Sequence, residues 1–503
     1  MKACLLLQRR FAYVGHNLAL LLKEHYGIDE FCGYVYVRRS YEFLMSQKEI
    51  HYSSLLLDQE IHGRYSSERI DTHFLQSLEA EYGIPNLWPY VSLDRALMHN
   101  RHVREYPYDK SHYSHDDLLR ILQVTAKAII KFLDDEKPDF IFFSVIGAVG
   151  GKLLYHIAKK RGIATYVVHP TMIHDNYVLS ETYNGLTGVE NKVHLFSKES
   201  APEKVLKQAQ NFLNDFRHQP RPHYEFADKK YHQTTKSKQL SFVLPTNALK
   251  IMRWFFVSLK HHATGRERHD YDYISPINYV KDGIRRKLRN LRGVDDLYDE
   301  PGENDNFTFF PLHYEPEVSL LLYAPFFADQ IHLIKQIAMS LPVNHYLYVK
   351  EHPTMVPYRP RNYYKAIKKI HNVKLINPNI SSFDLIARSK LIMTITSSVG
   401  WEATLLKKPV ITFGDIFYNQ LSFVKHCKTP ENIPYLVKEQ LENFRYDENE
   451  LLNLLAAIFS ESAHLNLQYL WEREKDLMKR KEGLKPLADL LAQKLHLTNK
   501  QLQ

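Results

Sequence analysis

Two polar segments follow short apolar runs in the C-terminal half of the chain, at points where strands are expected to end. The first follows HYLYV and the second follows LIMTI, and they consist of Lys350, Glu351, His352 and Pro353, and of Thr396, Ser397, Ser398, Val399 and Gly400. In an open α/β sheet, ligands bind outside the carboxyl ends of the strands. The basic and hydroxyl-bearing side chains therefore predict a shared site for an anionic ligand.

The second segment is typical of a phosphate site. A strand that turns through small hydroxyl residues into a helix presents backbone N–H groups, the positive end of the helix dipole and hydroxyl donors to one point. A helix N-cap formed by Ser397 or Ser398 explains the same residues without a ligand. Glu402, one helical turn beyond Ser398, can accept hydrogen bonds from ribose hydroxyls or complete a capping box.

His352 favours the ligand-binding interpretation. An imidazole held beside the rigid Pro353 can donate a hydrogen bond to a phosphate oxygen and stabilise a leaving phosphate or diphosphate. A histidine considered by itself has a structural role as often as a ligand-binding one. Further polar residues precede the segment SLLLYAP, among them His313 and Glu317. We expect His313 to help bind the same ligand and Glu317 to be a catalytic group.

Several other kinds of site are not indicated. The sequence has no Gly-rich phosphate loop ending in Lys and Ser or Thr, and the glycines at 147, 150 and 151 lack the spacing of a dinucleotide fingerprint. Without HExxH or paired cysteines, no metal is predicted. Three widely spaced cysteines, Cys4, Cys32 and Cys427, fit a reducing compartment and exclude a disulfide framework.

The alternation of apolar runs with amphipathic helical patterns predicts the elements that position these segments. From Phe307 onward we expect strands at SLLLYAP, HYLYVKE, VKLINP, LIMTIT and PVITFG, separated by helices, and hence a doubly wound parallel sheet. ACLLL, CGYVYV, FIFFSV and IATYVVH predict a second set near the N-terminus. The predicted fold class is α/β with two Rossmann-like domains.

At 503 residues the chain is too long for one ordinary core. We expect an N-terminal Rossmann-like domain over residues 1–195 and a basic, largely helical linker over 196–305. A C-terminal Rossmann-like domain is expected over 306–430, followed by a segment that is helical throughout over 431–503. No apolar run approaches the roughly 18 residues of a membrane-spanning helix, so a cytoplasmic protein is expected.

The formal charge of +9 and the pI near 9.0 predict an acidic partner. Basic residues gather in residues 245–295, where ALKIMRWFFVSLKHHATGRERH also carries large apolar side chains. This pattern fits a helix that lies on an anionic membrane surface, or a helix that packs on its own protein with a solvated basic face. No recognition helix or aromatic sheet motif is present, so nucleic acid is not an expected partner.

The segments FFPLHYEPE, LYVKEHPTM, VKLINPNISSFDLI and TITSSVGWEATLLKKPVITFGDIFY together resemble the capsule polysaccharide biosynthesis family, whose members include retaining Kdo transferases of bacterial capsule assembly. The resemblance covers mainly residues 305–420. It implies a GT-B architecture, in which two Rossmann-like domains face each other across a cleft. The C-terminal domain would bind the nucleotide donor and the N-terminal domain the acceptor, with no required metal or other cofactor.

The chain is also similar to bacterial sialyltransferases of the GT-B type, in which an HP motif and a Ser-Ser pair hold the phosphate of a CMP-sugar. His352 and Pro353 match the first motif, and Ser397 and Ser398 match the second. The resemblance implies a glycosyltransferase with a nucleotide-sugar donor, CMP-Kdo-like by preference. Its acceptor would be a growing bacterial surface or capsular polysaccharide or a lipid-linked precursor, on the inner face of the cytoplasmic membrane.

Two other functions remain open. A CDP-polyol phosphotransferase would need the same phosphate-binding residues, whereas a non-catalytic membrane-surface scaffold of a polysaccharide assembly complex would need none of them. On the acceptor side, His169, His174, Asp175 and Glu181 follow IATYVVH. Asp175 is the preferred catalytic candidate because it should lie in a loop past a strand end, facing the cleft, although a loop aspartate is also a common turn former.

Overall fold

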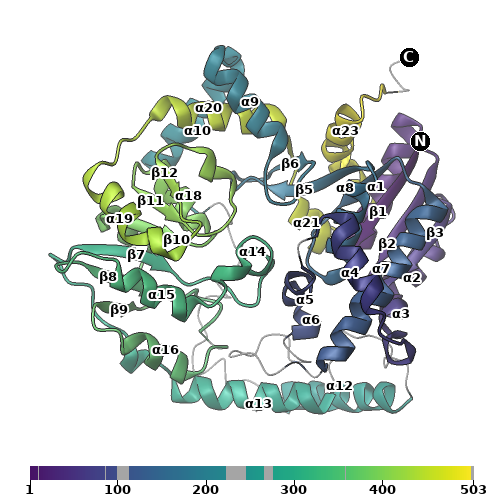
Figure 1. Ribbon diagram of the computed structural model, residues 1–503, viewed down its shortest axis with the longest axis horizontal. Coiled ribbons are helices and arrows are strands. Elements are labelled where there is room, and N and C mark those ends of the chain that lie inside the picture. Colours follow the sequence, from purple (N-terminus) through teal and green to yellow (C-terminus); the bar gives the residue numbers. More distant parts are fainter. Residues whose placement is uncertain are drawn as a thin grey trace.

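The computed structural model describes the chain except for residues 9–10, 85, 99–110, 112, 223–244, 265–275, 357 and 500–503. Two α/β lobes face each other, one built mainly from the N-terminal residues and one from the C-terminal half (Figure 1). The predicted α/β class with two Rossmann-like units is therefore confirmed.

The sheet of the N-terminal lobe has seven strands in the order β13-β6-β5-β4-β1-β2-β3. Its first five strands along the chain pair in parallel. They are β1 (Lys2–Leu7), β2 (Glu30–Val35), β3 (Tyr52–Leu57), β4 (Phe140–Phe143) and β5 (Ala164–Pro170). Antiparallel pairing adds β6 (Asn176–Ser180) and β13 (Ser462–His464) at one edge. Strands β1 and β4 are almost wholly apolar because helices cover both faces of the sheet.

The helices of this lobe form two apolar layers, one on each face of the sheet. In chain order they are α1 (Phe11–Tyr26), α2 (Arg38–Met45), α3 (Asp58–His62), α4 (Thr72–Tyr82), α5 (Trp88–Leu93), α6 (Arg95–Met98), α7 (His115–Glu136) and α8 (Val149–Lys160). The longest, α7, begins at a capping box in which Ser114 and Asp117 bond reciprocally, and it ends at the left-handed residue Lys137.

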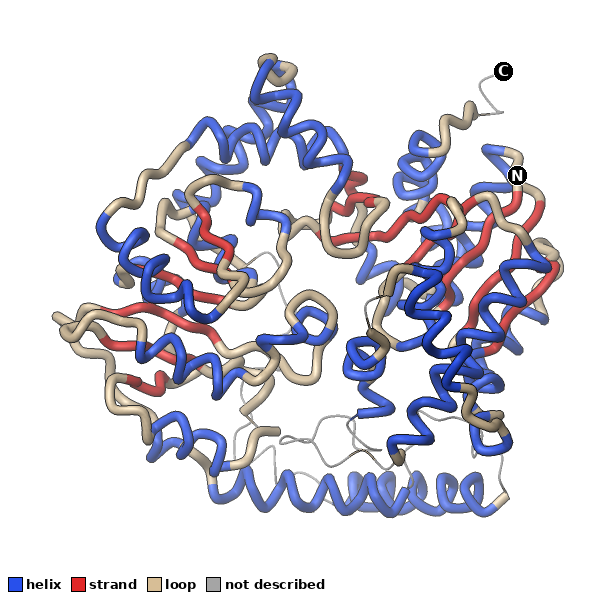
Figure 2. The backbone as a smooth tube through the Cα atoms, in the orientation of Figure 1, coloured by secondary structure: helices blue, strands red, loops and turns tan. Residues whose placement is uncertain are grey.

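The sheet of the C-terminal lobe has six parallel strands in the order β12-β11-β10-β7-β8-β9. Figure 2 shows strands of this lobe in red, with helices in blue around them. The strands are β7 (Phe307–Pro311), β8 (Tyr346–Lys350), β9 (Val373–Ile376), β10 (Leu391–Thr394), β11 (Val410–Thr412) and β12 (Val424–His426). The accompanying helices are α15 (Gln330–Met339), α16 (Arg361–Lys368), α17 (Ser382–Arg388), α18 (Ser398–Leu405) and α19 (Ile433–Glu442). The strand order reverses between β7 and β10, which is where such sheets bind ligands.

The remaining helices connect or extend the lobes. They are α9 (Thr187–Lys198), α10 (Glu203–His218), α12 (Pro245–Ala263), α13 (Pro276–Arg292), α14 (Val318–Leu321), α20 (Glu448–Glu461), α21 (Leu467–Glu472), α22 (Leu477–Gly483) and α23 (Lys485–Lys494). The lobes touch through α14, because Leu321 and Leu322 pack into the apolar cluster of the N-terminal lobe. A Cβ at Gly147, beside the start of α8, would lie 3.2 Å from Val318 Cγ2.

Two expected elements were wrong. SLLLYAP is not a strand: it contains α14 and a turn, because the aromatic run Phe307–Pro311 takes the central position of the sheet as β7. The tail is not helical throughout, since β13 pairs with β6 of the N-terminal lobe. Three residues are too few to show the alternation that predicts a strand.

Candidate functional site

The residues that follow β7, β8 and β10 meet at the reversal of the strand order. His313 follows β7, and its Nε2 accepts a hydrogen bond of 3.0 Å from the backbone N–H of Thr396, which follows β10. His352 follows β8 and lies close enough to His313 to help lower the pKa of that imidazole. The structure thus brings together three of the residues that the sequence analysis selected.

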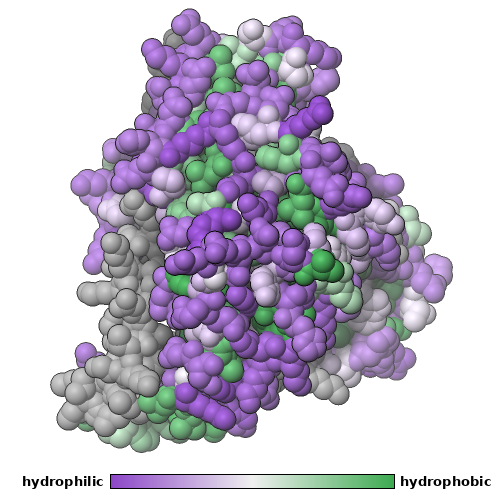
Figure 3. Space-filling view, turned by 90° about the vertical axis from the view of Figure 1, so that its left-hand side faces the viewer, coloured by the Kyte–Doolittle hydropathy of each residue, from purple (hydrophilic) through white to green (hydrophobic). Residues whose placement is uncertain are grey.

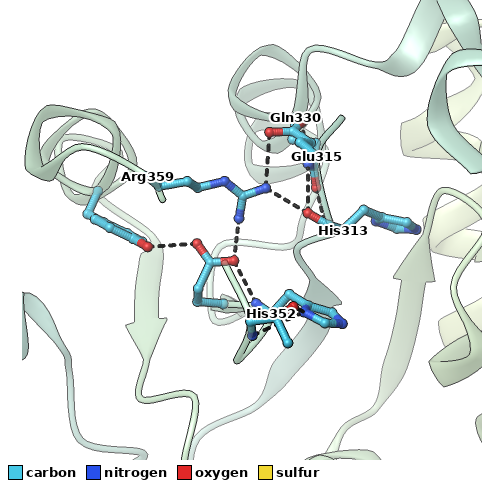
Figure 4. A network of polar contacts seen from close by, with 8 residues as sticks. His313, Glu315, Gln330, His352 and Arg359 are labelled. Carbon is cyan, nitrogen blue, oxygen red and sulfur yellow. Dashed lines mark hydrogen bonds and ion pairs between the residues drawn. The ribbon is translucent and has the colours of Figure 1, made fainter. Parts of the chain in front are cut away.

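A buried network centred on Arg359 holds these turns in place (Figure 4). The guanidinium of Arg359 is fully buried and forms ion pairs with Glu351 and Glu315, the second at 3.0 Å. It also donates a hydrogen bond of 2.7 Å to the carbonyl of His313. Because a buried carboxylate is costly without a partner, this arginine fixes the loops after β7 and β8 relative to each other.

Gln330 and Tyr364 complete the network. Gln330 accepts a bond of 2.7 Å from the N–H of His313 and donates one of 2.5 Å to Glu315, and the Tyr364 hydroxyl donates to Glu351 at 2.9 Å. Glu351 also accepts from the N–H of His352 at 2.6 Å. Glu351 is therefore an internal support of the site rather than a group that faces a ligand.

The sequence analysis did not identify Arg359. The only signal in the sequence is a basic residue directly before Pro360, within the turn that follows the HP pair. An arginine in a polar turn usually predicts an exposed side chain. Its burial becomes apparent only when β7 and β8 are adjacent.

The side chain of His352 is oriented by the next turn. The backbone N–H of Thr354 donates to its Nδ1 at 3.3 Å, and the Thr354 hydroxyl lies 2.6 Å from the same atom. A backbone N–H can only donate, so Nδ1 is the acceptor and Nε2 carries the proton of the neutral ring. Figure 4 shows the imidazoles of His313 and His352 on one side of the network, pointing away from Arg359.

His313 is a neutral structural imidazole. It is buried, and desolvation, together with electrostatic interactions with His352 and Arg359, lowers its pKa to about 3. Its Nε2 accepts the bond from Thr396, which requires an unprotonated nitrogen. His313 therefore joins the ends of β7 and β10, and it offers no positive charge to a phosphate at neutral pH.

The helix α18 starts at the Ser-Ser pair. Ser397 is its N-cap, with Oγ accepting the N–H of Val399 at 3.1 Å. The N–H of Ser397 donates to Thr394 Oγ1 at 3.2 Å, and its carbonyl accepts from the Tyr418 hydroxyl at 2.8 Å. Ser397 therefore forms the N-cap, and the positive end of α18 is held rigidly beside Thr396.

Gly400 is explained by packing within α18. A Cβ at this position would lie 2.4 Å from the Tyr418 hydroxyl and 2.8 Å from Thr394 Cγ2. Any side chain here would push the start of α18 away from the end of β10. Gly400 thus preserves the geometry of the turn, and nothing in its surroundings indicates direct contact with a ligand.

Glu402 of α18 and Lys350 at the end of β8 are two buried groups that interact electrostatically. Desolvation raises the pKa of Glu402 to about 8, although bonding to Ser398 and the charge of Lys350 oppose the shift. Desolvation lowers the pKa of Lys350 to about 8, and its Nζ donates to Ser382 Oγ at 2.7 Å. A protonated carboxyl and an ammonium can together bind the hydroxyls and carbonyls of a nucleoside.

Glu402→Gln should alter the pH dependence of stability. The folded protein holds the Glu402 proton up to about pH 8 and the unfolded chain only up to about pH 4.5, so the wild type loses stability as pH rises through this window. The neutral glutamine removes that loss. We expect the variant to melt above the wild type near pH 8 and level with it near pH 4. Thermal unfolding tests this, with exposed Glu431→Gln as the control that should show no such crossover.

Glu317 lies between the two lobes. Its side chain is exposed, yet protein surrounds it closely enough that desolvation raises the pKa of its carboxyl. Its Oε2 accepts from the Ser319 hydroxyl at 2.9 Å, and the charge of Arg95 in the N-terminal lobe partly offsets the shift.

Asp175 lies in the loop past the end of β5, as expected from the sequence, and its contacts run to the C-terminal tail. It forms the turn between β5 and β6 with a left-handed φ of 55°, which aspartate tolerates better than most residues. Its carbonyl accepts from the N–H of Leu465 at 2.8 Å, and its Oδ2 accepts from Asn466 at 3.3 Å. These contacts attach the turn to the C-terminal tail, so the turn-forming interpretation explains this residue.

The other candidates after β5 also have structural partners. His169 is buried, with its Nε2 at 3.0 Å from the carbonyl of Thr182, and desolvation lowers its pKa to about 4. His174 lies 3.3 Å from Asp175 Oδ2. Glu181 contributes its carbonyl to the hydroxyls of Tyr155 and Thr165.

No group of three or more His, Cys, Asp or Glu side chains able to hold a metal ion occurs among the described residues. Over the same part of the chain, no helix has the length and apolar character needed to cross a bilayer.

Sequence comparison relates the chain to capsule proteins. Residues 199–426 match the sequence model described as capsule polysaccharide biosynthesis protein. Protein FixF of Sinorhizobium fredii is 32% identical over 119 residues, 22% of this chain and 27% of FixF. Capsule polysaccharide modification protein LipA of Neisseria meningitidis serogroup B is 30% identical over 140 residues, 28% of this chain and 19% of LipA. The matched segments span about a quarter of the length of FixF and about a fifth of the length of LipA.

Solved structures show a distant likeness. KpsC β-Kdo 2,7 transferase of Thermosulfurimonas dismutans has a TM-score of 0.37 and 14% identity, covering 73% of this chain and 89% of that one. The β-Kdo 2,4 transferase of the same KpsC has a TM-score of 0.36 and 15% identity, with coverages of 66% and 83%. UDP-GlcNAc 2-epimerase of Neisseria meningitidis, bound to UDP-GlcNAc, has a TM-score of 0.27 and 13% identity, covering 92% of this chain and 99% of that one.

Proposed function

Because residues 199–426 belong to the capsule polysaccharide biosynthesis family, we propose that this chain is a metal-independent glycosyltransferase of the GT-B type. Its donor is a nucleotide-sugar, CMP-Kdo-like by preference, and its acceptor is a capsular or surface glycan or a glycolipid precursor. The reaction takes place at the inner face of the cytoplasmic membrane.

The observation that carries this proposal is the orientation of His352. The Thr354 N–H fixes Nδ1 as an acceptor, so Nε2–H is the donor, and the ring points away from the Arg359 network (Figure 4). The N-terminus of α18 follows β10, which β7 separates from β8 in the sheet. A ring N–H and a helix N-terminus at the reversal of strand order suit the phosphate of a nucleotide.

The proposed reaction uses this donor group at the leaving phosphate. The bond between the anomeric carbon and the phosphate oxygen breaks, and the phosphate leaves with the electron pair. His352 Nε2–H donates a hydrogen bond to the oxygen on which charge develops, and the dipole of α18 adds to the effect. A new bond forms between the anomeric carbon and the acceptor oxygen.

The acceptor hydroxyl must lose a proton. Glu317 is the carboxylate that best fits this role, because it is accessible, lies between the lobes and has a raised pKa. It replaces Asp175 as our candidate, since Asp175 is committed to the tail. Arg95, whose charge acts on Glu317, is a positive group of the facing lobe that suits an acidic acceptor.

Nucleotide binding tests the proposal. Thermal unfolding would be followed with CMP, CDP, UDP, GDP and ADP, for the wild type, His352→Ala and the exposed control His371→Ala. A ligand at about 100 times its dissociation constant stabilises by about 2.7 kcal/mol. We expect CMP to raise the melting temperature most, and this shift to be reduced in His352→Ala but unchanged in His371→Ala.

Other outcomes would point to other functions. A selective response to CDP would favour the polyol phosphotransferase, which needs the same phosphate site with a different donor. A wild type that responds to no nucleotide would contradict the transferase, and the non-catalytic scaffold would then be the better explanation.

A further inference from the structure

Helices α12 and α13 expose large apolar side chains at helical spacing. On α12, Leu249, Met252 and Phe256 are 62%, 51% and 62% exposed, and on α13, Ile284, Leu288 and Leu291 are 54%, 63% and 42% exposed. Each set recurs every three or four residues and so lies on one face of its helix. A contiguous exposed apolar face is unusual on a monomeric protein and marks an interaction surface.

The polar face of α13 is directed to the protein. The Arg286 guanidinium lies 5.3 Å from the Tyr358 ring centroid and bonds to Asp282 at 2.9 Å. Arg289 donates to the Tyr358 carbonyl, and Arg361 donates to the carbonyl of Gly293 at 3.1 Å. The amphipathic α13 is thus attached to the C-terminal lobe by its arginines, and its apolar stripe points outward.

The two helices form one surface. The rings of Trp254 on α12 and Tyr279 on α13 lie 5.0 Å apart. In Figure 1 the pair runs along one side of the molecule beneath both lobes, and Figure 3 shows hydrophobic residues in green along the same lower edge. A partner on this surface would therefore contact the molecule along a side that both lobes share.

The charge of this surface identifies the partner. The segments of α12 and α13 contain nine Lys and Arg residues and a single acidic residue, Asp282. Lys250, Arg253 and Lys260 are exposed beside the apolar side chains of α12, as are Lys281 and Arg292 on α13. Apolar residues flanked by basic ones match an anionic bilayer, whose acyl region takes up the former and whose lipid phosphates attract the latter.

We propose that α12 and α13 together form a surface that docks on an anionic lipid bilayer, with the apolar side chains inserted among the lipid headgroups. The helices lie in the plane of the interface. The inference deepens the proposed function by placing the enzyme where a lipid-linked acceptor is found, but its physical basis does not depend on catalysis.

Vesicle sedimentation tests the proposal. The full chain would be sedimented with vesicles of phosphatidylcholine, with or without phosphatidylglycerol, and the double variant Phe256→Glu/Leu288→Glu compared with it. The matched control is Met339→Glu/Val343→Glu, which adds the same charges at residues 80% and 108% exposed in the C-terminal lobe. We expect binding only with phosphatidylglycerol, weakened at least about tenfold in the double variant and by much less in the control.

Three results would overturn the inference: no binding of the wild type to either vesicle, equal binding to both, or equal loss in variant and control. Self-association through this face without vesicle binding, measured by light scattering, would also contradict it. The CMP melting shift should be the same in wild type and double variant. If vesicles bind and no nucleotide does, the membrane surface stands and the proposed transferase fails.

Discussion

The His352→Ala variant is expected to lose glycosyl transfer by about a hundredfold to a thousandfold in kcat. This is the usual effect of removing one fixed hydrogen-bond donor to a developing negative charge. The reason is specific to the ring orientation: the Thr354 N–H donates to Nδ1, so the proton of the neutral ring is on Nε2. The measurement is release of the nucleotide product at saturating donor and acceptor.

Two further substitutions distinguish a donor from a merely structural ring. The amide nitrogen of glutamine can reach the position of Nε2, whereas that of asparagine lies nearer to Nδ1. We therefore expect His352→Gln to retain more activity than His352→Asn or His352→Ala. Equal activity of all three, or unchanged kcat in His352→Ala, would show that His352 does not assist the leaving phosphate.

The Arg359→Met variant is expected to lose about 3–5 kcal/mol in the free energy of unfolding. Methionine fills much of the space but leaves the buried carboxylates of Glu351 and Glu315 without their cation. Equilibrium unfolding in urea measures the loss. The control is Arg361→Met, because Arg361 pairs with the exposed Asp296, and surface ion pairs contribute only about 0–1 kcal/mol.

The same variant should depend on pH in a defined direction. Burial already raises the pKa of Glu315 in the wild type, and losing Arg359 raises it further. The folded variant then binds a proton that the unfolded chain releases above about pH 4.5, so its stability falls as pH rises. Adding Glu315→Gln should recover part of the loss. A loss equal to that of Arg361→Met would mean that the buried network is not needed for stability.

The sequence predicts the polar turns of the site better than it predicts their supports. The segments after β8 and β10 could be found because parallel strands end at one edge, which brings His352 and Thr396 together regardless of details. Arg359 could not be found, since its burial depends on the adjacency of β7 and β8 rather than on local pattern. The assignment of SLLLYAP failed because an apolar run is compatible with a strand or with the docked helix α14.

The sequence did not predict the hairpin that carries Asp175 and the neighbouring histidines. Asp175 and the histidines near it follow β5, but β5 continues into the antiparallel hairpin with β6 instead of entering a helix. The rule that ligands bind at strand ends holds where a strand is followed by a helical crossover to a parallel strand. The segment HPTMIHDNYVLSE contains no sequence pattern that predicts a hairpin in place of such a crossover. Glu317 was selected from its neighbours in the sequence, whereas its proximity to Arg95 depends on the approach of the N-terminal lobe.

The pairing of β13 with β6 has a consequence for how the chain matures on the ribosome. The N-terminal lobe is synthesised first, but its sheet gains strand β13, and α1 gains its cover from α23, only once residues 462–494 have been made. Until then β6 presents an unpaired edge, the feature that recruits strands from other molecules. A chain ending at Glu461 should therefore aggregate, which light scattering would detect, and late synthesis is the period when this protein most needs a chaperone.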